Sequence, residues 1–533
     1  MKLKLKDQLK LYLFPKLVLV LHAFGFSWKK LGEITFFNKS ILLAQAKNLG
    51  KIEIESVKEK QNIFILTMLS FSTFHLVIEA LLALGLKSRG HDITFIIDDN
   101  ALPFFELKNI GKKSKSNNKA INGFVFASKL LDNLNLRYIP ISEYIKDGED
   151  FKYLKKYDSI LEAGLLKDYK VGVLSDDLPF IREKKEIIKR DIAVTHYIGE
   201  KTVKMRPDFV IMSHGIYSTW GPSFRVLDEN KIPILTYGRG KKRHTLVFNW
   251  NKTADTWDVS REWQKVKDIA LTENQLKEIN GYLDSRISHK DDVFIYNFGK
   301  ETSKLETIKN LGLDSKKPIY TLFTNVLWDA ASAQREIVFK NPVEWVIETI
   351  AWFNNHPEKQ LIVKIHPAEV VIGTNMPFYD IILSRIKPNK NIKIIKPNEK
   401  VNSWSIYDIT NLGIVHTTTV GMEMPLVDKP CMVVSKTHYR DKGFTIDVES
   451  KGEYYNLLQN FDTTAIDFKK NKMEALKYAY LLFIRYQIPF NMFYENASTD
   501  IRGFRDDKFN EYLKNDTYNR IIENIIVKKD IFN

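Results

Sequence analysis

The stretch from residue 412 to residue 445 constrains the fold more than any other part of the chain, because it has the pattern of a complete strand–helix–strand unit. Residues 412–415 and 431–434 are apolar runs with the length of a buried strand. Between them, three successive threonines and Gly421 form a tight polar turn that leads into a short predicted helix. Such a unit places its turns at the carboxyl ends of parallel strands, where open α/β sheets bind ligands.

Six residues of this stretch are candidates for binding an anionic ligand. The amides at the start of the predicted helix and the positive end of its dipole form an anion site, and the loop after the second strand is rich in cations. Glu423 lies one turn into the helix, where a carboxylate can accept hydrogen bonds from ribose hydroxyls. An ordinary capped helix with a solvated basic loop explains the same pattern. The candidates are Thr418, Thr419, Gly421, Glu423, Arg440 and Lys442.

The strand–loop–helix pattern occurs in two separate halves of the chain. Apolar runs at residues 62–68, 92–97 and 209–212 alternate with helical stretches in the first half, and the pattern restarts at residue 318. Because 533 residues are too many for one core, we predict an α/β protein with two Rossmann-like domains that face each other across a cleft. The expected division is an amphipathic basic extension and linker at 1–60, a first domain at 61–310, a second at 311–465 and a C-terminal helical segment at 466–533.

Polar loops at the ends of predicted strands supply further candidates. Ser72, Thr73 and His75 come shortly after the first strand, where a histidine can act as a general base or can face solvent from the start of a helix. Arg239 lies between two glycines after another strand, in a loop that either holds an anion or is a mobile surface turn.

The second half adds His366 and Glu369, which follow a predicted strand at residues 361–365. A histidine beside cations can donate a hydrogen bond to the phosphate of a leaving group. Together with the helix amides after residue 415, this histidine would recognise a nucleotide sugar and stabilise the charge that grows on a departing nucleotide.

Composition limits the class of partner. The net charge of +15 favours phosphate-rich partners such as nucleotides or anionic lipid, but no RNA- or DNA-binding motif accompanies it, so no nucleic-acid partner is predicted. Cys431 is the only cysteine, which indicates a reducing compartment. No CxxC, HExxH or well-placed DxD pattern is present, and no GxGxxG fingerprint follows a strand, so we expect no metal site and no cofactor.

The first 50 residues form a basic and apolar segment. Lysines precede an apolar stretch at residues 11–26 that Pro15 and Lys16 interrupt, and this stretch is shorter than the roughly 20 apolar residues of a spanning helix. The segment either lies on an anionic membrane surface or forms a helical extension packed on the main body. We therefore expect a cytoplasmic protein, with a peripheral position on the inner face of the membrane as one of two alternatives.

Several segments between residues 62 and 458, taken in order, resemble the capsular polysaccharide biosynthesis proteins, which belong with glycosyltransferases of the GT-B fold. They include MSHGIYSTWGP, YGRG, LFTNVLWDA, VKIHPAE and HTTTVGMEMPLVDKPCMVVSKTHYRDKGFT. The resemblance implies a metal-independent transferase that moves a sugar from a nucleotide sugar, held mainly by the second domain, to a surface glycan or lipid-linked glycan. The His-Pro pair and the threonine turn are similar to those of bacterial sialyltransferases and 3-deoxy-manno-octulosonate transferases. That similarity points to a CMP-linked donor and leaves UDP- and GDP-linked donors open.

The resemblance also implies roles for single residues. His366, Thr418 and Thr419 would contact phosphate, and Glu423 would contact ribose. Ser72, Thr73, His75 and His214 would face the acceptor. An inverting enzyme needs a base near the acceptor hydroxyl, for which His75 is the first candidate and Asp329 the second.

Two other functions are compatible with the sequence. One is a teichoic-acid-type polyol-phosphate transferase, which also has the GT-B fold and a His-Pro pair; Gly421 and Glu423 in the comparable helix favour a sugar nucleotide instead. The other is a non-catalytic basic scaffold that binds membrane or polyanion, in which the charges would act collectively and no single residue would be essential.

Overall fold

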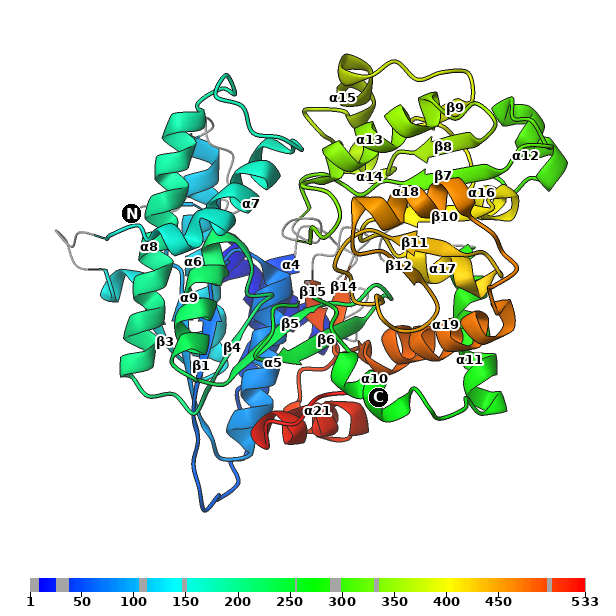
Figure 1. Ribbon diagram of the computed structural model, residues 1–533. Coiled ribbons are helices and arrows are strands. Elements are labelled where there is room, and N and C mark those ends of the chain that lie inside the picture. Colours follow the sequence, from blue (N-terminus) through cyan, green and yellow to red (C-terminus); the bar gives the residue numbers. More distant parts are fainter. Residues whose placement is uncertain are drawn as a thin grey trace.

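The computed structural model describes residues 9–24, 38–104, 113–145, 151–254, 256–287, 299–329, 335–495 and 501–532. These residues form two α/β domains, each built around one sheet, and Figure 1 shows the first at the left and the second at the right. The C-terminal segment passes from the second domain back to the first (Figure 1). The prediction of two Rossmann-like domains in a GT-B-like arrangement is confirmed.

The first domain contains a seven-stranded sheet with the order β13-β6-β5-β4-β1-β2-β3. The strands from β5 to β3 are parallel, whereas β6 pairs antiparallel with β5 and β13 pairs antiparallel with β6. Side chains of β1 alternate between the two faces, so Ile63 and Ile65 belong to one core while Phe64 and Leu66 belong to another. The strands are β1 (Asn62–Thr67), β2 (Asp92–Ile97), β3 (Arg137–Pro140), β4 (Phe209–Met212), β5 (Ile234–Arg239), β6 (Thr245–Trp250) and β13 (Ile488–Pro489).

Helices cover both faces of this sheet. The core that contains Ile63 is completed by α4 (Asn38–Leu49), α5 (Thr73–Ser88), α6 (Lys113–Asn133) and α21 (Asp516–Ile526). The core that contains Phe64 is completed by α8 (Ile181–Lys204) and α9 (Tyr217–Glu229), and α7 (Asp158–Tyr169) packs on these two. Short 3₁₀ helices lie at Ile141–Glu143 and Lys155–Tyr157.

The second domain contains a six-stranded sheet with the order β12-β11-β10-β7-β8-β9, in which all neighbouring strands are parallel. Parallel strands are buried on both faces, which explains why the sequence shows them as continuous apolar runs. The strands are β7 (Ile319–Phe323), β8 (Gln360–Lys364), β9 (Ile392–Ile395), β10 (Leu412–Val415), β11 (Cys431–Val433) and β12 (Ile446–Asp447).

Helices cover both faces of the second sheet as well. One face packs against α13 (Pro342–Asn354), α15 (Phe378–Arg385) and α18 (Lys451–Asn460). The other face packs against α16 (Ser403–Ile409), α17 (Val420–Leu426) and α19 (Phe468–Tyr480). The remaining helices of this region are α10 (Ser260–Val266), α11 (Glu273–Ile287), α12 (Lys304–Leu311) and α14 (Ala368–Val371).

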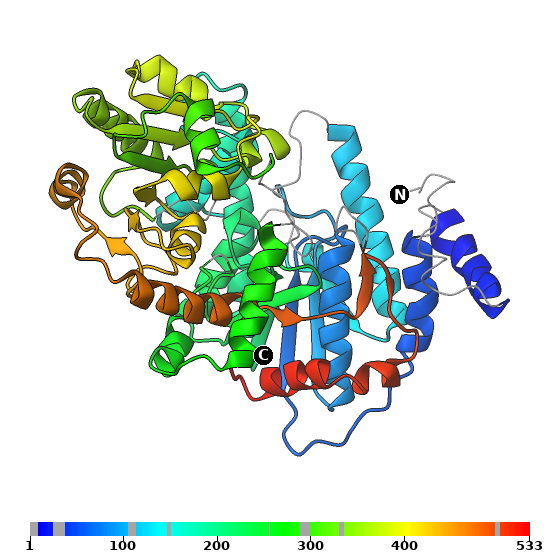
Figure 2. The same ribbon diagram turned by 90° about the vertical axis from the view of Figure 1, so that its right-hand side faces the viewer.

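The C-terminal segment joins the two domains. Helix α19 and the π-helical turn at Leu481–Arg485 pack on the second domain, and β13 then pairs with β6 of the first (Figure 2). The expected helical segment at 466–533 therefore also contains strands: β13, β14 (Phe493–Glu495) and β15 (Ile501–Phe504), followed by α20 (Phe509–Leu513) and α21. The entire second domain lies between Leu246 and Ile488 in the sequence, and so no local pattern indicates that these two residues pair.

The N-terminal extension packs partly on the first domain. A π-helical turn at Leu9–Leu13 leads into α2 (Phe14–Ala23), and α4 follows. The amide of Gln45 on α4 donates to the Phe504 carbonyl and accepts from the Phe504 N–H, both at 2.9 Å, which ties α4 to β15. None of the helices in the described ranges is long and apolar enough to cross a membrane.

Candidate functional site

A pocket of about 410 Å³ lies between the two domains. In the part of the chain that the structure describes, its lining contains five cations, which come from the first domain, the connection and the second domain, and one carboxylate, that of Asp329. A volume of this size suits a nucleotide-sized ligand, and the excess of cations selects an anion. The five cations are Lys167, Lys241, Arg286, Arg335 and Lys436.

Four neighbouring strands of the second sheet end at this pocket. β7 leads to Asn325, β8 to His366, β10 to the threonine turn at residues 417–419 and β11 to residues 436–438. The carboxyl ends of parallel strands meet at one edge of a sheet, so residues up to 113 positions apart in sequence become neighbours. The predicted location of the site, at the strand ends of the second domain, agrees with this geometry.

His366 lines the pocket with a defined tautomer. Its Nδ1 accepts a hydrogen bond from the backbone N–H of Ala368 at 3.1 Å, and the backbone N–H of His366 donates to Thr324 Oγ1 at 3.0 Å. Burial, and then the nearby charges of Lys364 and Lys241, lower the pKa of His366 to about 4. The neutral ring therefore carries its proton on Nε2, from which it can donate to a ligand.

The threonine turn is held in place from β7. Asn325 Nδ2 donates to Thr417 Oγ1 at 2.7 Å, and the Thr417 N–H donates back to Asn325 Oδ1 at 3.1 Å. Thr418 and Thr419 both line the pocket, and the Thr418 carbonyl accepts from the Tyr439 hydroxyl at 2.6 Å. These contacts fix the turn at the pocket.

Gly421 lies behind the turn rather than in the pocket lining. A Cβ added at this position would lie 2.6–2.7 Å from ring atoms of Tyr439. The glycine thus allows the Tyr439 ring to approach the helix start and its hydroxyl to reach the Thr418 carbonyl. Its contribution in the structure is close packing.

Glu423 is also absent from the pocket lining, and its carboxylate is used by other side chains. Oε1 accepts from Arg286 Nη2 at 2.9 Å and from Thr419 Oγ1 at 3.1 Å, and Oε2 accepts from the Tyr407 hydroxyl at 2.9 Å. Arg286 does line the pocket. The geometry therefore makes Glu423 the anchor of a pocket cation, and contact with ribose stays a prediction.

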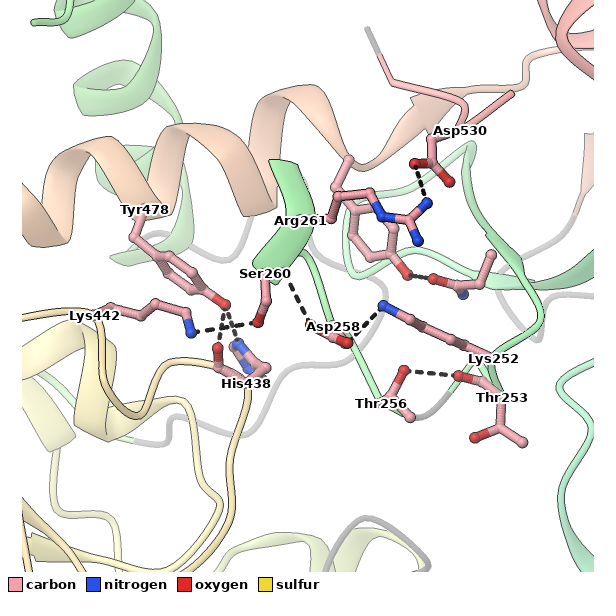
Figure 3. A network of polar contacts seen from close by, with 12 residues as sticks. Lys252, Thr253, Thr256, Asp258, Ser260, Arg261, His438, Lys442, Tyr478 and Asp530 are labelled. Carbon is pink, nitrogen blue, oxygen red and sulfur yellow. Dashed lines mark hydrogen bonds and ion pairs between the residues drawn. The ribbon is translucent and has the colours of Figure 1, made fainter. Parts of the chain in front are cut away.

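Two other predicted donor-side residues, Arg440 and Lys442, contact the protein elsewhere. Arg440 donates to the carbonyls of Val433 and Val448, at 3.1 and 2.9 Å, and joins β11 to the chain after β12. Lys442 Nζ donates to Ser260 Oγ at 3.3 Å across the domain junction (Figure 3). Neither residue is among those that line the pocket.

Glu369 follows His366 by one helical turn but points into the second domain. Its Oε2 accepts from the N–H of Phe378 at 3.2 Å, and burial raises the pKa of its carboxyl group to about 7. It is not part of the pocket lining.

The predicted acceptor-side residues lie behind the first-domain wall of the pocket. His75 Nδ1 and Ser72 Oγ are 2.7 Å apart at the start of α5, which begins at Thr73, and burial followed by the charge of Arg239 lowers the pKa of His75 to about 4. The ring of His214 packs 4.4 Å from that of Trp220, which in turn lies 6.0 Å from that of His75.

Tyr217 connects this group to the pocket. Its ring centroid lies 6.0 Å from that of His214, and its ring also lies 3.7 Å below the Lys167 ammonium group in the lining. Arg239, by contrast, pairs with Glu495 at 2.8 Å and stacks over the Phe74 ring at 4.0 Å. None of the five predicted acceptor-side residues, His75 included, lines the pocket itself.

His438 is a pocket residue that the candidate list did not contain. The Tyr478 hydroxyl of α19 donates to the His438 carbonyl at 2.6 Å and lies 3.0 Å from His438 Nδ1 (Figure 3). Because the hydroxyl proton is already used, Nδ1–H must be the donor in the second contact. Burial, and then the charges of Lys241, Lys442 and Arg335, lower the pKa of His438 to about 3, so neutral His438 presents Nε2 as an acceptor.

Sequence patterns indicate only some of the five pocket cations. Lys241 and Lys436 lie in basic loops after strands, which is a usable signal, whereas Lys167 is one of several lysines on helical surfaces. Arg335 reaches the pocket because its carbonyl accepts from the Lys436 N–H at 2.7 Å, next to a bridge between Glu336 and Ser435. Arg286 is placed by the buried carboxylate of Glu423.

No protein-family model matches the chain, and no curated protein sequence matches it. Among solved structures, it is similar to the β-Kdo 2,4-transferase of KpsC from Thermosulfurimonas dismutans, with 18% identity over 57% of this chain and 87% of that one and a TM-score of 0.36. The β-Kdo 2,7-transferase of the same KpsC gives 12% identity over 52% and 79%, with a TM-score of 0.31. UDP-GlcNAc 2-epimerase from Neisseria meningitidis, bound to UDP-GlcNAc, gives 11% identity over 78% and 94%, with a TM-score of 0.23.

Proposed function

We propose that this protein is a GT-B-type glycosyltransferase, which transfers a sugar from a nucleotide-sugar donor to a capsular or related surface glycan. The observation that carries the proposal is the cationic pocket between two Rossmann-like domains, at the strand ends of both. A donor held there can meet an acceptor that enters from the opposite domain. The acceptor is a glycan or a lipid-linked glycan, and the protein acts in the cytoplasm.

The second domain supplies the groups that suit a nucleotide phosphate. Arg335 and Lys436 provide charge, the turn at Thr418 and Thr419 provides hydroxyl groups, and His366 provides a neutral Nε2–H donor. These groups can neutralise the charge that develops on the leaving nucleotide without a metal ion. We therefore propose a metal-independent reaction with no cofactor other than the donor substrate.

Of the two candidate general bases, Asp329 and His75, Asp329 is better placed. Among the described residues that line the pocket it is the only carboxylate, whereas His75 lies outside this lining and is hydrogen-bonded to Ser72. In an inverting transfer, the Asp329 carboxylate would take the proton of the acceptor hydroxyl as the oxygen attacks the anomeric carbon and the nucleotide leaves.

The proposal is tested by the thermal stability of the full chain with CMP, UDP, GDP, ADP and their sugar conjugates, without metal and with a chelator present. A ligand at a hundredfold excess over its dissociation constant adds about 2.7 kcal/mol to the free energy of unfolding. We expect one base to dominate, which selects among the CMP, UDP and GDP classes, and we expect the shift to persist with the chelator.

Variants locate the binding. His366→Ala should abolish most of the shift, while His356→Ala, on the surface of the same domain, should leave it intact. A shift with nucleotides but no sugar transfer to any glycan, together with transfer of polyol phosphate, would identify the teichoic-acid type of transferase. The absence of any nucleotide-dependent shift would contradict the proposal and favour the scaffold.

A further inference from the structure

Helix α2 is apolar on two opposite faces. On one side, Leu11 and Val18 are buried, and Val18 packs with Ile41 and Ala44 of α4. This face docks the helix onto the first domain. The only fixed charge within α2 is that of Lys16.

The other face of α2 carries a row of large apolar side chains that are 43–80% exposed. Leu17 and Val20 lie in α2 itself, Leu13 ends the π-helical turn before it and Phe24 follows its last residue; their spacings of four, three and four residues place them on one side of the helical segment, and Tyr12 of the same turn adjoins them. A continuous row of exposed apolar side chains indicates a site that a partner covers. We name these five residues the α2 face.

Lysines surround the α2 face. The Lys129 ammonium group of α6 lies 3.3 Å from the Tyr12 ring centroid. Burial and, after it, the charges of Lys47 and Lys16 lower the pKa of Lys129, which shows that three cations from three helices are close enough to repel each other. Such a cluster favours an anionic partner, because the partner relieves the repulsion.

The whole N-terminal region has the same charge bias. Residues 1–50 contain nine lysines, no arginine and two carboxylates, those of Asp7 and Glu33. Apolar side chains surrounded by lysines match the interface of an anionic bilayer, where hydrocarbon lies beside phosphate headgroups.

We propose that the α2 face docks the protein onto the surface of a bilayer that contains anionic lipids, with α2 lying in the plane of the interface. A helix of 10 residues spans about 15 Å, half of a hydrocarbon core, so it suits a position along the surface. Figure 2 shows α2 at the edge of the first domain remote from the second domain, so docking leaves the inter-domain pocket uncovered. A second copy of the chain is a poorer occupant, because a symmetric contact would bring the lysine cluster against its own image.

The test is co-sedimentation of the full-length protein with phosphatidylcholine vesicles, alone or mixed with phosphatidylglycerol. We expect binding to the mixed vesicles that weakens with salt, and little binding to phosphatidylcholine alone. Leu17→Gln/Val20→Gln and Lys16→Glu/Lys129→Glu should each weaken this binding about tenfold or more, because one removes buried apolar area and the other inverts the charge.

The matched control is Ile269→Gln/Leu305→Gln, which changes two exposed apolar residues on other elements and should bind as wild type does. Melting temperature and nucleotide response should be the same in all variants, since every changed side chain lies outside the pocket. Wild-type protein that fails to bind mixed vesicles, or a Leu17→Gln/Val20→Gln variant that binds them fully, would overturn the proposal. So would self-association that this variant abolishes in the absence of vesicle binding.

Discussion

Two histidines of the pocket hold their protons on opposite ring nitrogens, although burial and neighbouring cations lower the pKa of both. The Ala368 N–H keeps Nδ1 of His366 unprotonated, so this residue is a donor from Nε2. Tyr478 keeps Nδ1 of His438 protonated, so that residue is an acceptor at Nε2. A pocket with this pair can donate a hydrogen bond to a phosphate oxygen and accept one from a hydroxyl group.

At the residue scale, Asp329→Asn should lower the rate of sugar transfer about 10²- to 10⁴-fold, because the amide cannot accept the acceptor's proton. Nucleotide binding should be retained, since phosphate is held by other side chains. Single-turnover transfer and nucleotide-dependent thermal shift measure the two effects separately. Retention of turnover in Asp329→Asn, with loss in His75→Ala, would instead assign the base to His75.

Glu423→Gln distinguishes two roles for this carboxylate. If Glu423 acts by anchoring Arg286, the variant should weaken the binding of nucleotide and of inorganic pyrophosphate alike, each by about tenfold. Pyrophosphate has no ribose, so a contact with ribose would weaken nucleotide binding alone. Titration calorimetry of both ligands decides between them, and the exposed Glu358→Gln, on the same domain, serves as the control.

At the scale of elements, α5 carries a buried carboxyl group against the first sheet. Glu79 accepts from the Thr67 hydroxyl of β1 at 2.6 Å and from the Tyr237 hydroxyl of β5 at 2.7 Å. Burial raises the pKa of Glu79 to about 8 despite these hydrogen bonds. The group is therefore protonated in the folded state at neutral pH, and it joins three elements of the first domain.

This carboxyl group predicts the sign of a pH effect on stability. Between the unfolded pKa, which is about 4.5, and the folded pKa of about 8, the folded state binds one more proton than the unfolded state. The contribution of Glu79 is thus fully present below that window and is lost as the pH rises through it. Chemical denaturation at several pH values should show a decline in the free energy of unfolding that Glu79→Gln reduces. An unchanged slope in the variant would contradict this assignment.

At the scale of the whole molecule, the two domains are joined by the C-terminal segment and also by direct hydrogen bonds beside the pocket, at the end of α7. Thr374 Oγ1 and the Asn375 N–H donate to the Lys170 carbonyl, at 2.7 and 3.1 Å, and Asn375 Nδ2 donates to the Tyr169 carbonyl at 2.6 Å. Lys170 Nζ donates in return to the Ile372 carbonyl at 2.7 Å. These bonds link the end of α7 in the first domain to the loop after α14 in the second.

Thr374→Ala/Asn375→Ala removes two of these bonds and should favour a more open arrangement of the domains. At about 1 kcal/mol for each bond, the balance shifts by about tenfold or more towards the open state, and nucleotide affinity falls accordingly. Small-angle scattering should show a larger radius of gyration without ligand and a return towards the wild-type value with nucleotide. Asn456→Ala/Asn460→Ala, exposed on α18, is the control. Equal scattering from both variants and wild type would show that the bonds between α7 and the loop after α14 do not hold the domains together.

Local sequence patterns predict many of the strands and the α/β class of the protein correctly. The apolar runs at residues 92–97, 209–212 and 412–415 coincide with β2, β4 and β10, because a strand buried on both faces needs consecutive apolar side chains. Repetition of the strand–helix pattern then requires parallel sheets, whose carboxyl ends indicate where a ligand binds. His366, Thr418, Thr419 and Asp329 were placed at the pocket on this basis.

Long-range contacts, which no local pattern contains, determine which polar side chains face the pocket and which stabilise the fold. Glu423, Arg440 and Glu369 have residue types that are typical of ligand-binding groups, yet each of them forms hydrogen bonds with other groups of the protein. Lys167, Arg286 and Arg335 reach the pocket through α7, α11 and a bridge beside β11, and β13 completes the first sheet from the far end of the chain. A local pattern records burial along one element, whereas the direction of a side chain across a domain junction depends on contacts between residues hundreds of positions apart.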